Sequence, residues 1–258
     1  MSQPTPTPRS PIRNDKPSSP LGDVALGLIP LVAVSLATCW MLALPTSHTL
    51  LSVVPYAALG ALLLAKLPPG HPGRGLGPAN RLTLARAALV LPLAVLPLRA
   101  PSLVPGGITQ TGYWWIVALS ALALALDGLD GPLARRTGTG SRFGARFDME
   151  LDAFLLLALS ALVWRSAKVG SWVLLIGGLR YFFVLAGRLW PTLQGALPPS
   201  RRRNVICAVQ GVVLVSCLAP VIPPTLATTF AASALLLLVY SFVVDTWSLA
   251  RDATRSTT

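Results

Sequence analysis

The feature that most constrains this chain is a succession of long apolar runs separated by short polar breaks. Of its 258 residues, 53% are hydrophobic and 12% are charged, whereas a soluble domain carries about 25% charged residues. Each run is close to the ~20 residues that a helix needs to cross a membrane. The composition therefore excludes soluble, disordered, collagen-like and coiled-coil classes, and it predicts an all-α, polytopic membrane protein.

The apolar runs predict about eight transmembrane helices. We place them at about residues 24–44, 49–65, 82–98, 113–133, 145–164, 170–190, 204–222 and 225–247. The second run is short, so the first two could instead form a re-entrant hairpin. Residues 1–20 are rich in proline and serine and are expected to be a disordered cytoplasmic tail. An N-terminal transmembrane hairpin would follow at 21–66.

The basic residues predict the orientation of these helices. The chain has 21 Lys and Arg residues against 9 Asp and Glu, a formal net charge of +12. In a soluble protein this excess would suggest nucleic-acid binding. Here the basic residues flank apolar runs, so we expect membrane lipids and no nucleic acid as partners. With the N-terminus inside, Arg99, Arg165 and Lys168 fall outside, Arg180 lies within a span, and all other basic residues are cytoplasmic. The positive-inside rule thus predicts an N-in/C-in topology.

The acidic residues are concentrated in one part of the chain. None lies between 24 and 126 or between 153 and 244. Five of the nine gather near the cytoplasmic ends of the fourth and fifth spans, namely Asp127, Asp130, Asp148, Glu150 and Asp152. Carboxylates at membrane depth are costly and repel one another, and a bound cation offsets both effects.

The spacing of these acids places four of them on two helical faces. Asp127 and Asp130 are three residues apart and Asp148 and Asp152 four apart, so each pair shares one side of its helix. The connection between the two helices is short, which allows the faces to oppose each other. Glu150 projects roughly 200° away from Asp148 and is expected to face outward. Four carboxylates offering only oxygen ligands suit Mg²⁺ or Mn²⁺, as one ion or two.

A fixed pattern over the same segment resembles a known family. From Asp127 onward the chain reads D-x2-D-G-x2-A-R-x8-G-x3-D-x3-D, which is similar to the motif of the CDP-alcohol phosphatidyltransferases. Its fixed positions are Asp127, Asp130, Gly131, Ala134, Arg135, Gly144, Asp148 and Asp152. Upstream, Asn80, Thr83 and Arg86 fit the family's N-x-L-T-x-x-R segment.

The resemblance extends over about residues 78–247 and implies a domain organisation. A CDP-alcohol phosphatidyltransferase domain of six helices would occupy 78–250, preceded by the hairpin and followed by a C-terminal tail at 251–258. The family likeness also implies a homodimer. It places the active site at the cytoplasmic face of what would be a bacterial inner membrane.

Roles for individual residues follow from the same resemblance. Asp127, Asp130 and Asp148 would bind the metal ions, and Asp152 would be the general base while also touching the second ion. The CDP moiety of the donor would be held by Asn80, Thr83, Gly131, Ala134, Arg135, Ser141 and Gly144, of which Ala134 and Gly144 are the small residues that admit it.

The resemblance implies transfer of a phosphatidyl group, from CDP-diacylglycerol as donor, to an alcohol acceptor with release of CMP. The sequence does not identify the alcohol. Basic residues at Arg180, Arg188 and 201–203 favour a phosphorylated polyol such as glycerol 3-phosphate or inositol phosphate, and serine remains open. For Arg180 the alternative is snorkelling or pairing with Asp245. For Arg201, Arg202 and Arg203 the alternative is a plain anchor at the inner face.

Two other interpretations of the acids are open. The carboxylates could form salt bridges with Arg135, Arg142 and Arg146 and serve only to join two helices. The chain could also be a transporter or channel subunit with a carboxylate ion site, but acids would then be spread at mid-membrane depth over several helices. His48 and His71 fall in expected loops and are expected to be surface residues.

Overall fold

A computed structural model describes residues 19–65, 77–99, 107–137, 142–189 and 201–255 of the chain. Within these ranges, some helix ends are described by their backbone alone. Their side chains lie outside the described part at 77–80, 129–137, 142–146, 186–189, 201, 245 and 248–255. Residues 1–18 of the expected N-terminal tail, the loop around His71 and residues 256–258 fall outside the described residues. Residues 251–255, expected in the C-terminal tail, continue α8.

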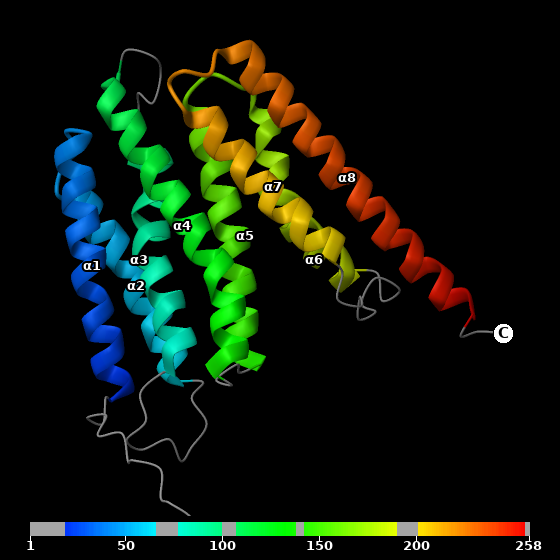
Figure 1. Cartoon of the computed structure of the whole chain (residues 1–258), viewed down its shortest axis with the longest axis horizontal. Helices are drawn as coiled ribbons and strands as arrows, with labels where there is room; N and C mark the ends of the chain where they lie inside the picture. Colours follow the sequence, from blue (N-terminus) through cyan, green and yellow to red (C-terminus); the bar gives the residue numbers. More distant parts are fainter. Residues whose placement is uncertain (1–18, 66–76, 100–106, 138–141, 190–200, 256–258) are drawn as a thin grey trace, which may run out of the picture.

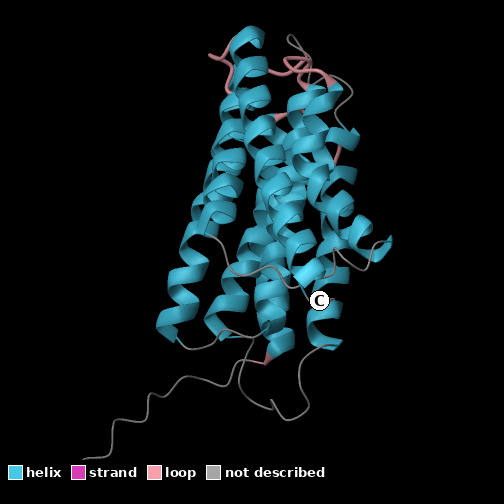
Figure 2. Ribbon diagram, turned by 90° about the vertical axis from the view of Figure 1, so that its right-hand side faces the viewer, coloured by secondary structure: helices cyan, strands magenta, loops and turns pink. Residues whose placement is uncertain are grey.

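The described residues form eight α-helices and one short 3-10 turn, which confirms the all-α prediction (Figures 1 and 2). Each apolar run corresponds to one helix, with bounds that differ by a few residues. The helices are α1 (Pro20–Met41), α2 (Ser47–Ala65), α3 (Gly77–Arg99), α4 (Gln110–Thr137), α5 (Arg142–Arg165), α6 (Leu174–Leu189), α7 (Arg201–Leu218) and α8 (Pro224–Arg255), with the turn η1 (Ser171–Val173) before α6.

The length and hydropathy of these helices fit a membrane protein. Among the described residues, five helices are apolar over a stretch long enough to cross a bilayer: α1, α2, α3, α4 and α8. The helices α1 and α2 are each continuous, with 22 and 19 residues, so each is long enough to span and neither needs to turn back. The three remaining α-helices of the bundle are α5, α6 and α7.

Helix α3 is the centre of the first half of the bundle. It packs against α1 and α2 on one side and against α4 and α5 on the other. Most of its residues from 83 to 96 are buried. Figure 1 shows that α3 and α5 begin, and α4 ends, at the same end of the bundle where α1 begins. Side chains from α3, α4 and α5 can therefore meet at that end.

The hairpin of α1 and α2 is held by close packing. The Ser19 side chain accepts a hydrogen bond from the Gly22 N–H and so caps α1. Tyr56 of α2 is fully buried and donates its hydroxyl to the Val24 carbonyl at 3.2 Å. A Cβ at Gly27 would lie 1.9 Å from that hydroxyl oxygen, so only glycine leaves room for the tyrosine.

One sequence prediction about the hairpin is wrong. His48 was expected on the surface, but it is fully buried in the first turn of α2. The connection after Met41 is so short that α2 already begins at Ser47, and the first turn of α2 therefore packs against the end of α1. The Cys39 thiol lies 3.7 Å from the Thr49 hydroxyl across this junction.

Candidate active site

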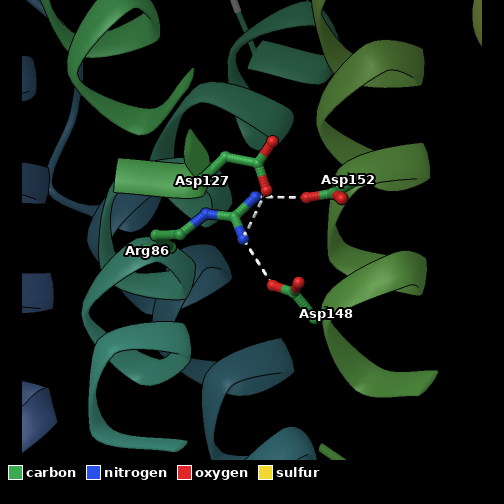
Figure 3. A network of polar contacts seen from close by, with 4 residues as sticks. All are labelled: Arg86, Asp127, Asp148 and Asp152. Atoms are coloured by element: carbon green, nitrogen blue, oxygen red, sulfur yellow. Dashed lines mark hydrogen bonds and ion pairs between the residues drawn. The ribbon is translucent and has the colours of Figure 1, made fainter. Parts of the chain in front are cut away.

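The most concentrated charge network among the described residues is a cluster of three carboxylates around one arginine (Figure 3). The Arg86 Nη1 lies 3.0 Å from Asp127 Oδ1 and donates to Asp148 Oδ1 at 2.6 Å. Its Nη2 donates to Asp152 Oδ1. A single guanidinium thus contacts all three acids, which come from two helices. We call these four residues the acid cluster.

Helix geometry explains why these side chains meet. Asp127 lies near the end of α4, and Asp148 and Asp152 lie one turn apart near the beginning of α5. Arg86 comes from the third turn of α3, which packs against both α4 and α5. The prediction that Asp127, Asp148 and Asp152 share one site therefore agrees with the geometry.

The burial of the acid cluster is asymmetric. The Arg86 side chain has no exposed surface, whereas the three carboxylate side chains are between 25% and 36% exposed. The arginine therefore forms the closed floor of the cluster, and the acids form its open side. A buried arginine requires such partners, because an uncompensated buried charge is strongly destabilising.

The charges of the acid cluster do not balance. One guanidinium offsets one carboxylate, so the four groups keep two negative charges when all are ionised. One oxygen from each of Asp127, Asp148 and Asp152 lies within 4.8 Å of the others, a spacing at which like charges repel. An additional cation at the open side would relieve this repulsion. The donor set is oxygen only, which suits Mg²⁺ or Mn²⁺.

Several predicted site residues lie on these helices, but their side chains are outside the described part. Asp130 follows Asp127 by one turn of α4, at the register position that shares its face. The same applies to Asn80 in α3, to Gly131, Ala134 and Arg135 in α4, and to Gly144 in α5. Ser141 lies outside the described residues altogether. Thr83 is described, and it is buried in α3 one turn before Arg86.

The predicted outward direction of Glu150 agrees with the structure, which also gives Glu150 a partner that the sequence did not predict, Arg180. The Glu150 side chain is exposed, and its Oε1 accepts a hydrogen bond from Arg180 Nη2 of α6 at 2.8 Å. The sequence had offered Asp245 as a partner for Arg180, and the side chain of Asp245 is outside the described part. Arg202 and Arg203 are half-buried in the first turn of α7, and the side chain of Arg201 is not described.

The residue that the sequence reasoning missed is Arg86. The topology prediction places Arg86 among the cytoplasmic basic residues, and the resemblance makes it a fixed position of the N-x-L-T-x-x-R segment. Neither predicts a contact with the acids. The structure instead buries it completely against the acids. A signal was available, because Arg86 lies inside an apolar run and a charge there needs a partner. The salt-bridge interpretation named Arg135, Arg142 and Arg146, whose side chains are not described.

The fold and the acid cluster together define a helical membrane protein with a carboxylate site. The family model for CDP-alcohol phosphatidyltransferase matches residues 77–247. The chain therefore belongs to the CDP-alcohol phosphatidyltransferase family. Neither a curated protein nor a solved structure matches the chain. Residues 1–76, including α1 and α2, precede the matched region.

Proposed function

We propose that this protein transfers a phosphatidyl group from CDP-diacylglycerol to a small alcohol and releases CMP. The observation that supports this most directly is the convergence of Asp127, Asp148 and Asp152 within 4.8 Å in a chain that belongs to this family. In the proposed reaction the acceptor hydroxyl oxygen attacks the β-phosphorus of the donor. The bond from this phosphorus to the bridging oxygen breaks, and CMP leaves with that oxygen.

The acid cluster fits the divalent ions that such a reaction uses. Asp127, Asp130, Asp148 and Asp152 would hold Mg²⁺ or Mn²⁺, as two ions in the proposed arrangement. When bound, the ions would neutralise charge on the diphosphate. The chain's own contribution is to hold the acids at short range. Arg86 does this from the buried side and leaves their exposed side to the cytosol.

We assign the general base to Asp152. Its carboxylate is one quarter exposed and belongs to the open side of the acid cluster, so an acceptor hydroxyl can come within hydrogen-bond reach. Taking that proton contributes about 10²–10⁴-fold to the rate of such reactions. The proton is then held at the Asp152 carboxylate until it passes to water.

The donor would be held by residues on all three helices around the acid cluster. Asn80 and Thr83 on α3 and Arg135 on α4 would bind the CDP moiety, and the guanidinium fork suits a phosphate. Ser141 would add a hydroxyl. Gly131, Ala134 and Gly144 would leave space for the nucleotide, because small side chains let a ligand or another helix approach closely.

The acceptor would bind near the beginning of α7 and the middle of α6. Arg180 is about one third exposed and already paired with Glu150, so an anionic acceptor would have to share or replace that partner. Together with Arg201, Arg202 and Arg203 it favours a phosphorylated polyol over serine.

The proposed site faces the cytoplasm of a bacterial inner membrane. The helix α3, which carries Arg86 in its third turn, begins at the end of the bundle where α1 begins (Figure 1), and the basic residues concentrate on the same side by the positive-inside rule. The family likeness further suggests a homodimer. The proposed domain spans 78–250, between the hairpin 21–66 and the tail 251–258.

A transporter or channel subunit is the other candidate. Its acids would line a path through the membrane. The acids of the described cluster instead gather around a single buried arginine and do not follow one another along a path, a geometry that favours the transferase.

The test is release of CMP by the purified full chain in lipid nanodiscs, given CDP-diacylglycerol, Mg²⁺ or Mn²⁺, and a panel of alcohols. We expect metal-dependent CMP release with at least one acceptor. The Asp152→Asn variant should bind the donor as the wild type does and lose about 10²–10⁴-fold in CMP release. Normal turnover by that variant would remove the base assignment, and ion flux without CMP release would favour the transporter.

A further inference from the structure

The N-terminal hairpin contacts the site-bearing helix through an ion pair whose carboxylate is buried. Asp23, in the first turn of α1, lies 3.0 Å from Arg81 of α3, Oδ1 to Nη2. The Asp23 side chain is 2% exposed and that of Arg81 is 50% exposed. A carboxylate this deeply buried is retained only where partners compensate its charge. The contact joins a region outside the family match to a residue inside it.

Arg81 occupies a specific place on α3. It directly follows Asn80 and precedes Thr83 by two residues. It also precedes Arg86 by five residues, about 7.5 Å along the helix and roughly 140° around it. One face of α3 therefore meets the hairpin through Arg81, and another meets the acids through Arg86. A shift of α3 relative to α1 would move Thr83 and Arg86 together.

Packing next to the ion pair fixes the height of α1 against α3. Gly27 follows Asp23 by one turn and is covered by the Tyr56 hydroxyl group, and a Cβ at Gly27 would also reach 3.9 Å from Leu84 Cβ of α3. Leu31, Tyr56 and Leu84 belong to one buried apolar cluster. The first turns of α1 are thus held against the beginning of α3 by side-chain packing as well as by the ion pair.

We propose that Asp23 is a positioning residue for the donor site. Through Arg81 it fixes the beginning of α3, and with it the segment from Asn80 to Thr83 that would hold the CDP moiety. The hairpin of α1 and α2 is then a working part of the transferase rather than an independent membrane anchor. This inference rests on the proposed function, because it concerns binding of the CDP-linked donor.

The chain offers a matched control at the other end of α1. Thr38 accepts a hydrogen bond at 3.1 Å from Trp115 Nε1 of α4. Thr38 is also a polar contact between hairpin and core, but it lies roughly 22 Å along α1 from Asp23. Both substitutions nearly keep the side-chain shape: Thr38→Val removes the contact to Trp115 and the bond that the Thr38 hydroxyl donates to the Val34 carbonyl, and Asp23→Asn removes the charge of the ion pair. The first substitution lies far from the donor site, the second next to it.

The experiment measures donor KM, kcat and apparent Tm for full-length wild type, Asp23→Asn and Thr38→Val in nanodiscs, with CDP-diacylglycerol, Mn²⁺ and the best acceptor. We expect Asp23→Asn to raise donor KM about two- to fivefold with kcat unchanged, the range that loss of about one ion pair with an exposed partner supports. Thr38→Val should lower Tm and leave KM unchanged. Asp23→Glu, which keeps the charge, should recover part of the KM.

An unchanged donor KM in Asp23→Asn would overturn the inference while the proposed function stands. Equal KM changes in both variants would also overturn it, because they would report general loosening of the hairpin. If Asp23→Asn alone does not fold, the double variant Asp23→Asn/Arg81→Gln removes both charges of the pair, so that neither is left unpaired, and it is judged by the same KM comparison. A wild type that neither binds CDP-diacylglycerol nor releases CMP would overturn the proposed function, and this inference with it.

Discussion

Two partly or fully buried cations, Arg86 and Lys168, lie at opposite ends of the bundle and are compensated in different ways. Lys168, in the turn after α5, donates from Nζ to the carbonyls of Cys217 at 3.2 Å and Ala219 at 2.6 Å, at the end of α7. A lysine at a helix C-terminus satisfies carbonyls that have no partner within the helix. Arg86 instead faces three carboxylates.

The difference separates a structural cation from one in a working site. Around Lys168 the partners are neutral dipoles, and burial lowers the pKa of its ammonium, so its surroundings carry no surplus of negative charge. Among the described side chains around Arg86, negative charge exceeds positive charge, and the carboxylates stay partly open to solvent. A surplus of charge that a fold maintains at an open site is a sign of ligand binding.

The largest expected effect comes from removing the arginine. Arg86→Gln would leave three close carboxylates without their buried cation, and loss of one partner from a buried charge network costs roughly 3–5 kcal/mol. We expect a large fall in apparent Tm without metal and a loss of CMP release. Mn²⁺ should raise the Tm of the variant more than that of the wild type, because the ion offsets the charge that Arg86 had offset.

Thermal unfolding with and without Mn²⁺ measures this. Arg86→Lys keeps the charge but loses the guanidinium fork, so its apparent Tm should lie between those of the wild type and Arg86→Gln. An apparent Tm of Arg86→Gln equal to that of the wild type would contradict this role of Arg86, and so would an equal rise in the Tm of both proteins with Mn²⁺.

A smaller effect is expected at the other end of the bundle. Lys168→Met keeps the apolar stem and loses the two hydrogen bonds to α7. Because Lys168 is only partly buried, we expect a loss of about 1 kcal/mol, or roughly 2–4 °C in Tm. CMP release and its metal dependence should be unchanged. A loss of metal dependence in Lys168→Met would show that the two cations are not separable.

The sequence predicted the helices and the grouping of the acids, because both depend on local patterns. Long apolar runs define each helix, and the spacings of Asp127 and Asp130 and of Asp148 and Asp152 place each pair on one face of its own helix. What it did not predict are contacts between segments far apart in the chain. Arg86 contacts acids on two other helices. Asp23 of the hairpin contacts Arg81 of α3. Neither pair has a sequence spacing that reveals it.

Local turn geometry explains the misjudged histidine. The apolar runs predicted at 24–44 and 49–65 place His48 in the loop between them. The turn is instead so short that α2 begins at Ser47 and encloses His48. Apolar periodicity locates the middle of a helix well, but its end depends on packing against the neighbouring helix.

The most direct test of the central claim is binding of Mn²⁺ alone to the acid cluster, followed by electron paramagnetic resonance on the full chain in nanodiscs. The account predicts that Asp148→Asn weakens Mn²⁺ binding roughly tenfold or more, about 1.4 kcal/mol per tenfold step. Glu150→Gln, which removes an outward-facing carboxylate from the same helix, should bind within about twofold of wild type. Equal Mn²⁺ affinity in wild type and Asp148→Asn would contradict the account.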